Sequence, residues 1–249
     1  MSDPLYISEI FSSIQGEGLL AGRRQVFVRM VGCNLDCRYC DTDYQNTDPC
    51  RVETRAGSAS FTRLAQPLAL DTVVGIMTDW IAALPGAHHS VSLTGGEPLL
   101  HVDVLSAWLP ALRRLLPIHL ETNGTLYPAM EQIIEQIDYI SMDIKLPSTA
   151  GCQEQLWERH RLFLRAARAR NVSVKVVVSE DTPPGEIRQA CGLIASVDPA
   201  IPLFLQPLSL SCGSIGISGA HILSLQELAS SLLADVRVIP QMHKLLRVL

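Results

Sequence analysis

Three cysteines occur close together in one short stretch of the chain. Cys33, Cys37 and Cys40 have the spacing C-x3-C-x2-C in a loop that begins at Gly32. Three thiolates at this spacing can hold one face of an iron–sulfur cube, which usually takes four cysteine ligands and here would keep one iron open. A structural zinc site prefers four closed ligands and paired C-x2-C knuckles, and no second knuckle is visible. Cys50 is a candidate for a fourth ligand, whereas simple burial of the three thiols is disfavoured by their polar neighbours.

Other polar clusters follow predicted strands. Residues 26–31 lead into the cysteine loop, 91–93 into Thr94-Gly95-Gly96-Glu97-Pro98, 118–120 into Glu121-Thr122-Asn123-Gly124-Thr125, 140–142 into Asp143-Ile144-Lys145, 203–205 into Gln206, and 236–239 into Pro240-Gln241-Met242-His243-Lys244. The carboxyl ends of parallel strands share one face, where α/β barrels and sheets hold their active sites. The sequence therefore predicts that these clusters form one site.

The elements that must position this site alternate along the chain. Strands are predicted at residues 5–11, 25–31, 90–93, 118–121, 139–143, 172–178, 202–206 and 236–239, and helices at 71–84, 102–116, 128–137, 152–169, 185–197 and 221–233. Asp71 is expected to cap the first helix, and Pro110 to kink or split the second. Such repeated units predict an α/β fold with a parallel sheet covered by helices. We interpret residues 1–249 as a single domain with a polar insertion at about 43–67, which contains a hairpin of residues 51–55 and 60–64.

Composition narrows the class of protein further. The 249 residues carry a net charge of −5, with 47% hydrophobic and 18% charged residues, which excludes disorder as the main state and disfavours nucleic-acid binding. Seven cysteines are too few for a disulfide scaffold and cannot all pair within one chain. Neither a signal peptide nor an apolar run of about eighteen residues is visible, so we expect a cytoplasmic protein without membrane association.

The cysteine loop resembles the signature of the radical S-adenosylmethionine superfamily. Tyr39 fits the aromatic residue often found between the last two cysteines, and Gly95-Gly96-Glu97-Pro98 resembles the motif whose backbone meets the methionine amino group. The resemblance implies a partial, irregular (β/α) barrel and a [4Fe-4S] cluster on the three cysteines. It also implies that S-adenosylmethionine chelates the open iron and is split by an electron from the cluster to give a 5′-deoxyadenosyl radical, which makes these cysteines catalytic.

Further segments resemble the 7-carboxy-7-deazaguanine synthase family. They are Glu9-Ile10-Phe11, Gln15-Gly16-Glu17-Gly18, Phe27-Val28-Arg29, Gly32-Cys33-Asn34-Leu35, Cys40-Asp41-Thr42, Glu121-Thr122-Asn123-Gly124-Thr125 and Gln241-Met242-His243-Lys244. This resemblance implies a ring-contracting lyase that converts 6-carboxy-5,6,7,8-tetrahydropterin to 7-carboxy-7-deazaguanine with loss of ammonia, on the route to queuosine and other deazapurines. It also implies a homodimer, and a magnesium ion that Thr42 binds together with substrate, because one hydroxyl is a weak site by itself.

The resemblance also suggests roles for the residues at the strand ends. Substrate binding is expected from Ile14, Gln15, Gly16, Glu17, Arg29, Thr94, Pro240 and Gln241; Arg29 suits a carboxylate, and Glu17 is our own addition as an acceptor for the pterin edge. Cofactor binding is expected from Tyr39, Gly96, Glu97, Glu121, Asn123, Ser141, Asp143, Lys145 and Gln206. Some relatives carry Ser-Pro-Lys at residues 141–145, and here Ser141 or Lys145 is expected to take the part of that lysine.

Two other functions share the cysteine pattern. A glycyl-radical enzyme activating protein would act on a protein partner, and a non-enzymatic iron–sulfur protein would sense or transfer electrons. The segments Gln15–Gly18 and Cys40–Thr42 favour the small-molecule enzyme. A basic patch of Arg159, Arg161, Arg165, Arg168 and Arg170 is able to attract an acidic flavodoxin-type reductase, although a solvated helix face is the simpler interpretation. His243 is expected to be a surface or packing residue rather than an acid or base, and the pair His88-His89 is expected to be solvated loop rather than a metal ligand.

Overall fold

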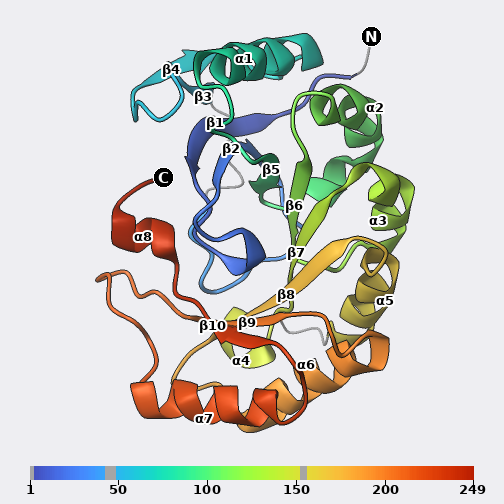
Figure 1. The fold of residues 1–249 in the computed structure, drawn as a ribbon, viewed down its shortest axis with the longest axis vertical. Coiled ribbons are helices and arrows are strands. Elements are labelled where there is room, and N and C mark those ends of the chain that lie inside the picture. Colours follow the sequence, from blue (N-terminus) through green and yellow to red (C-terminus); the bar gives the residue numbers. More distant parts are fainter. Residues whose placement is uncertain (1–2, 43–48, 152–155) are drawn as a thin grey trace.

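A computed structural model describes residues 3–42, 49–151 and 156–249 (Figure 1). Its strands are β1 (Ile7–Ile14), β2 (Arg24–Met30), β3 (Cys50–Glu53), β4 (Phe61–Leu64), β5 (Ser90–Gly95), β6 (Ile118–Thr122), β7 (Tyr139–Asp143), β8 (Asn171–Val178), β9 (Leu203–Pro207) and β10 (Val236–Val238). They form one sheet in the order β10-β9-β8-β7-β6-β5-β2-β1-β3-β4, which is not closed. The predicted partial barrel is therefore confirmed.

Most of the sheet is parallel, as predicted. β2 pairs in parallel with β5, and the strands from β5 to β10 are all parallel to one another. β1 is antiparallel to β2. Only residues 15–23, with the short 3-10 helix Gly18–Leu20, connect the two strands, and a parallel pair needs a longer crossover connection.

The predicted hairpin in the insertion is present. β3 and β4 pair antiparallel, and β3 also pairs in parallel with β1, so the insertion extends the main sheet at its edge. Residues 43–48 lie outside the described part of the chain. Cys50 begins β3 and is fully buried in the hydrophobic core, where burial raises the pKa of its thiol to about 12. It is therefore not placed as a cluster ligand.

The helices are α1 (Leu70–Ala83), α2 (Val102–Arg113), α3 (Tyr127–Ile133), α4 (Pro147–Ala150), α5 (Trp157–Ala167), α6 (Pro184–Val197), α7 (Gly219–Ser230) and α8 (Met242–Leu246). Short 3-10 helices span Pro98–His101 and Ile134–Gln136. In Figure 1, α2, α3, α5, α6 and α7 form an arc along one side of the sheet, and α8 lies apart from them on the opposite side. Among the described residues, no helix is long and apolar enough to cross a membrane.

Two helix details differ from the prediction. The N-cap of α1 is Ala69, so Asp71 lies in the first turn, where its charge still favours the helix N-terminus without capping it. α2 continues through Pro110, which is exposed, and is not split there. The outer helices bury residues such as Trp80 and Trp108 against the sheet, and this packing holds the strand ends in place.

Candidate active site

A cavity of about 560 Å³ opens at the carboxyl ends of the parallel strands. This volume lies within the range of small-molecule sites, roughly 300–1,000 Å³. The cavity lining includes most of the predicted site residues: Ile14, Gln15, Gly16, Glu17, Arg29, Cys33, Cys37, Tyr39, Cys40, Thr42, Thr94, Gly96, Glu121, Asn123, Ser141, Asp143, Lys145, Gln206 and Gln241. The structure thus brings together clusters that are far apart in the sequence.

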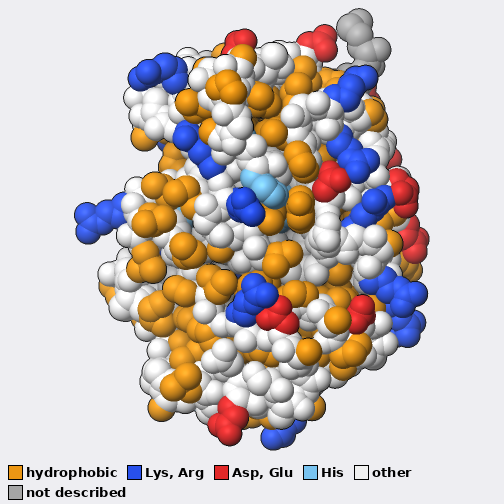
Figure 2. Space-filling model, in the orientation of Figure 1, with side chains coloured by type: hydrophobic (Ala, Val, Ile, Leu, Met, Phe, Trp, Pro, Cys, Tyr) orange, Lys and Arg blue, Asp and Glu red, His pale blue; other side chains and the backbone are white. Residues whose placement is uncertain are grey.

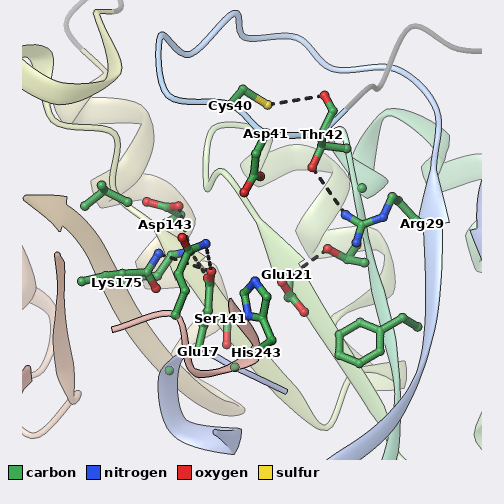
Figure 3. Close-up of a pocket in the computed structure, with 18 of the residues that line it drawn as sticks. Glu17, Arg29, Cys40, Asp41, Thr42, Glu121, Ser141, Asp143, Lys175 and His243 are labelled. Atoms are coloured by element: carbon green, nitrogen blue, oxygen red, sulfur yellow. Dashed lines mark hydrogen bonds and ion pairs between the residues drawn. The ribbon is translucent and has the colours of Figure 1, made fainter. Parts of the chain in front are cut away.

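One side of the cavity is formed by a pair of arginines and a glutamate. Arg29 Nε lies 3.4 Å from Glu9 Oε2, and Arg51 Nη1 lies 2.7 Å from Glu9 Oε1. Arg29 also donates from Nη1 to Thr42 Oγ1 at 3.4 Å, as Figure 3 shows. The stacked rings of Phe11 and Phe27, with centroids 4.9 Å apart, lie beside Arg29. This side offers cationic donors next to a flat apolar surface.

The opposite side holds a chain of alternating charges. Lys175 pairs with Glu17 and lies 3.2 Å from Asp143 Oδ2. Asp143 Oδ2 also accepts from Lys145 Nζ at 2.8 Å, and Lys145 donates to the Tyr39 hydroxyl at 3.1 Å. Figure 3 shows Glu17, Asp143 and Lys175 converging across the cavity from Arg29. Because the two acids alternate with the two lysines, this side is electrically balanced.

Pairing sets the ionisation of this group. Burial by itself raises the pKa of Glu17, but the charge of Lys175 and hydrogen bonds from Lys175 and Gln241 outweigh it and lower the pKa to about 2. Burial by itself lowers the pKa of Lys145, but the charges of Asp143, Tyr39 and Cys37 and the hydrogen bond to Asp143 together outweigh it, so the pKa lies well above its ordinary value. Glu17 and Lys145 are therefore both charged at neutral pH. Gln206 and Gln241 each donate to Glu17 Oε1, at 3.3 and 2.7 Å.

Glu121 lies between the two sides. Its Oε1 accepts from Gln15 Nε2 at 2.8 Å and from Ser92 Oγ at 2.6 Å, and its Oε2 accepts from Thr94 Oγ1 at 3.3 Å. These contacts place Glu121 against residues predicted to bind substrate, although the sequence grouped it with the cofactor. Below it, the buried His119 contacts Ser141 Oγ at 2.8 Å.

The cysteine loop lines the same cavity. The Cys33 and Cys37 side chains are half-buried and Cys40 is exposed, so three thiols from one loop open onto one space. Among the described residues, no three His, Cys, Asp or Glu side chains are close enough to bind a single metal ion. In a cube each thiolate binds a different iron, so the sulfurs stand farther apart than the roughly 3.8 Å of a zinc tetrahedron. Three thiols on one cavity wall therefore fit a cluster.

An S-adenosylmethionine molecule is also compatible with the cavity wall. Asp143 Oδ1 is buried and has no hydrogen-bond partner among the described residues, so it can accept from the amino or hydroxyl groups of a ligand. Gly95 has φ of +115°, and a Cβ there would lie 2.4 Å from the backbone of Met30. Only glycine fits this close approach, which lets the backbone at Gly96 reach the cavity.

Two predicted site residues do not line the cavity. Glu97 is fully buried beneath it, where its carboxylate accepts from the backbone N–H of Leu99 and Asn123 and from Thr122 Oγ1. Burial raises the pKa of Glu97 to about 7 despite these hydrogen bonds. Glu97 thus positions Asn123, whose Nδ2 lies 4.0 Å from Cys33 Sγ. Pro240 precedes the lining residue Gln241 but does not reach the cavity itself.

The C-terminal segment closes one edge of the site. The backbone N–H of Met242 donates to Gly16 O at 3.0 Å, and Lys244 Nζ donates to Asp41 Oδ2 at 2.7 Å. A Cβ on Gly16 would lie 2.0 Å from His243 Nδ1, so glycine is required for the segment to pack here. His243 lines the cavity, and burial lowers its pKa.

Sequence reasoning missed several lining residues, among them Glu9, Arg51 and Lys175. Lys175 interrupts the apolar run of 172–178, and a lone charge in a buried strand is a usable signal of an inward-facing residue. The partnership of Glu9 with Arg51 depends on strand pairing in the insertion, and the sequence gives no register for it. The prediction of a solvated loop is wrong for His88, which is buried, contacts Ser12 Oγ at 2.8 Å and does not line the cavity.

Comparison with known proteins identifies the class. A family model described as the radical SAM superfamily matches residues 27–189. The fold resembles the crystal structure of QueE from Escherichia coli, with a TM-score of 0.58, 20% identity, and coverage of 95% of this chain and 93% of that one. It also resembles SuiB from Streptococcus suis bound to S-adenosylmethionine, with a TM-score of 0.53, 16% identity and coverage of 84% and 48%. The chain belongs to the radical SAM superfamily.

Curated relatives identify the family within that class. The chain is 48% identical to a 7-carboxy-7-deazaguanine synthase of Geobacter sulfurreducens, with 96% of this chain and 95% of that protein covered. It is 37% identical to the protein of the same name from Methanothermobacter thermautotrophicus, over 96% of each. The chain is therefore a member of the 7-carboxy-7-deazaguanine synthase family, as its motifs indicated.

Proposed function

We propose that this chain converts 6-carboxy-5,6,7,8-tetrahydropterin to 7-carboxy-7-deazaguanine with loss of ammonia. As a member of its family it is a radical SAM carbon–nitrogen lyase of deazapurine biosynthesis. The observation that carries the assignment is that the three cysteine thiols of one loop and Arg29 open onto one cavity. A non-enzymatic iron–sulfur protein would not need the cationic side of the cavity around Arg29.

The cysteine side of the cavity is proposed to hold the cofactors. Cys33, Cys37 and Cys40 bind a [4Fe-4S] cluster, and the cluster with S-adenosylmethionine supplies the radical chemistry when both are bound. Gly96 offers its backbone to S-adenosylmethionine, and Asp143 Oδ1 offers a free acceptor. The remaining proposed cofactor contacts are Tyr39, Glu121, Asn123, Ser141, Lys145 and Gln206.

Some relatives carry a lysine in a Ser-Pro-Lys segment, and Ser141 and Lys145 are the two candidates for its role here. The contacts in the structure favour Lys145. Lys145 is held by Asp143 and Tyr39 with its amine at the cavity. Ser141 Oγ instead contacts the buried His119 Nε2. Lys145 therefore offers a fixed positive charge to an anionic group of the cofactor.

The arginine side is proposed to hold the substrate. Arg29 binds the carboxylate, because a guanidinium fork matches both carboxylate oxygens. The ring then extends past Thr94 toward Glu121 and Glu17, whose carboxylates can accept from its amino and amide N–H groups. Gln15 fixes Glu121 by a hydrogen bond at 2.8 Å, so the acceptor is oriented before substrate arrives.

Glu121 is also held in a fixed orientation against the proposed substrate wall. Its three hydrogen bonds hold both oxygens at the cavity wall. Ile14, Gly16 and Gln241 complete the proposed substrate wall, and the C-terminal segment around Gln241 limits water access.

We extend the proposal to a magnesium ion at Thr42. The Thr42 hydroxyl lies beside Arg29 and supplies one oxygen. Asp41, which precedes Thr42, is already paired with Lys244, and Asp43, which follows it, lies outside the described residues. Because one hydroxyl next to a cation is a poor site for Mg²⁺ by itself, the ion must enter together with substrate oxygens.

The chain is proposed to act as a single-domain, cytoplasmic homodimer. Exposed apolar side chains gather on α8 and the tail (Leu245, Leu246, Val248 and Leu249) and on the loop before α7 (Leu210 and Ile215). Figure 2 shows hydrophobic side chains gathered over this side of the molecule. An apolar patch of this kind supports pairing with a second copy, which analytical ultracentrifugation tests.

A flavodoxin-type reductase is proposed as the electron donor. Arg159, Arg165 and Arg168 are exposed on and beside α5. Arg161 pairs with Glu158 and Arg170 with Glu135, and these ion pairs reduce the net charge of the patch. If the rate at which flavodoxin reduces the cluster does not depend on salt concentration, that result counts against docking at this patch.

The function is tested by an anaerobic assay. Protein with a reconstituted cluster is incubated with 6-carboxytetrahydropterin, S-adenosylmethionine, Mg²⁺ and dithionite, and product is measured by mass spectrometry together with released ammonia. We expect both products, and none from Cys37→Ala. Absence of deazaguanine product from wild-type protein that holds four irons per chain would contradict the proposal.

A further inference from the structure

The insertion contributes an arginine to the cationic side of the cavity. In the strand pairing, Glu9 of β1 lies opposite Arg29 of β2 and opposite Arg51 of β3. Arg29 in turn lies opposite Thr94 of β5. Residues opposite each other in neighbouring strands project to the same face of a sheet, and all four line the cavity. The sheet thus presents Arg51, Glu9, Arg29 and Thr94 as one continuous row.

The charges in this row do not balance. Two guanidinium groups flank one carboxylate, which leaves an excess of one positive charge at this side. The Glu9 side chain is only 13% exposed and lies between the arginines, whereas those of Arg29 and Arg51 are 28% and 49% exposed. A single anionic group from a ligand would neutralise the excess, and it would reach the arginines from the cavity.

The hydrogen-bond geometry leaves donors available on Arg51. Glu9 Oε1 lies 2.7 Å from Arg51 Nη1 but makes no well-aligned hydrogen bond among the described residues. The Arg51 guanidinium also lies over the ring of Phe61, 4.3 Å from its centroid, which fixes the plane of the fork. A guanidinium has five N–H donors, so an oriented fork that contacts Glu9 through Nη1 retains other donors for a ligand.

We propose that Arg51 is a second arginine for the substrate carboxylate and a determinant of specificity for carboxylated pterins. Arg29 binds the carboxylate from β2, Arg51 binds it from β3, and Glu9 keeps the two guanidinium groups side by side. This inference rests on the proposed function, since it names a further residue of the same site. It gives the polar insertion a role, which is to complete the anion-binding side.

The test compares Arg51→Gln with Arg63→Gln. Arg63 lies opposite Arg51 on β4, is exposed and does not line the cavity, so its variant removes the same charge from the same hairpin. Holoenzyme with an oxidised cluster does not turn over, so the pterin is not consumed during the measurement. Dissociation constants for the pterin are therefore measured by calorimetry with S-adenosylmethionine present. The ligands are 6-carboxytetrahydropterin and tetrahydropterin without the carboxylate.

We expect Arg51→Gln to weaken binding of the carboxylated pterin about tenfold, which is typical of one lost charge-assisted contact. Binding of tetrahydropterin should not change in either variant, and Arg63→Gln should match wild type with both ligands. In turnover, Arg51→Gln should raise KM with little change in kcat. If Arg51→Gln bound the carboxylated pterin as tightly as wild type, and wild type made product, the role of Arg51 would be overturned and the proposed function would stand. Failure of wild type to bind either pterin would overturn the proposed function with it.

Discussion

The two sides of the cavity use charge in different ways. On the side of β7 and β8, Glu17, Lys175, Asp143 and Lys145 alternate in sign, are largely buried and have no net charge. On the side of β1 to β3, Arg29 and Arg51 are more exposed, and together with Glu9 they have a net charge of one positive. A buried, balanced chain orients groups without attracting ions, whereas an open, unbalanced cluster attracts an anion. The comparison assigns positioning to the first side and substrate capture to the second.

The largest expected effect comes from unbalancing the buried side. Lys175→Met leaves Glu17 without its cation, and loss of one partner of a buried pair costs about 3–5 kcal/mol. We expect a fall of this size in the free energy of unfolding, measured by urea titration. The double variant Lys175→Met with Glu17→Gln removes both charges and should recover most of the loss. A single variant as stable as wild type would show that this side is not a compensated network.

Glu97 sharpens the same comparison, because it is buried and no cation of the described residues lies at hydrogen-bonding distance from its carboxylate. Its pKa is raised from 4.5 to about 7, so the folded state holds the proton more tightly than the unfolded state does. This contribution to stability is present below about pH 4.5 and is lost as pH rises through 7. The loss amounts to about 3 kcal/mol, at about 1.4 kcal/mol for each pKa unit.

The difference between wild type and Glu97→Gln across this range measures the effect. Glu97→Gln should lack the decline in unfolding free energy between pH 4.5 and 7, while the exposed control Glu131→Gln should keep it. If the unfolding free energies of wild type and Glu97→Gln had the same pH dependence, the Glu97 carboxylate would be ionised throughout the range from pH 4.5 to 7.

The open side should respond in binding rather than in stability. Arg29→Ala is expected to lower kcat/KM about 100-fold through KM, since it removes a bidentate charged contact. Its unfolding free energy should change by less than about 1 kcal/mol, because partly exposed ion pairs contribute little. Arg29→Lys should recover little activity, since a lysine cannot form the fork. A large loss of stability with unchanged KM would assign Arg29 to the scaffold instead.

The smallest effect concerns magnesium. Thr42→Ala removes one proposed oxygen ligand, while substrate and water oxygens remain. We expect the magnesium concentration for half-maximal activity to rise several-fold, as steady-state rates across a magnesium titration would show. An unchanged magnesium dependence would remove Thr42 from the proposed site.

Local patterns in the sequence predicted much of the fold and the site. The cysteine loop and the clusters after residues 93, 120 and 142 could be found because each is contiguous, and the strand-end rule brings them to one face. Partners that depend on register could not be found in this way. Arg51 reaches Glu9 only because β3 pairs with β1, and Lys175 meets Glu17 across 158 positions.

Adjacency in sequence also misled in two places. Glu97 and Pro240 each neighbour a lining residue, Gly96 and Gln241, but do not line the cavity. Glu97 instead lies in the interior, where the N–H groups of Leu99 and Asn123 satisfy it. Contiguity therefore predicts which loops form a site, but not which way each side chain points.

The most direct test of the two-sided account is an anaerobic crystal structure of the holoenzyme with S-adenosylmethionine and 6-carboxytetrahydropterin. The account predicts the substrate carboxylate within hydrogen-bonding distance of the Arg29 guanidinium, on the side of β1 to β3, with Lys145 and Asp143 facing S-adenosylmethionine. A substrate carboxylate bound instead by Lys145 or Lys175 would contradict it.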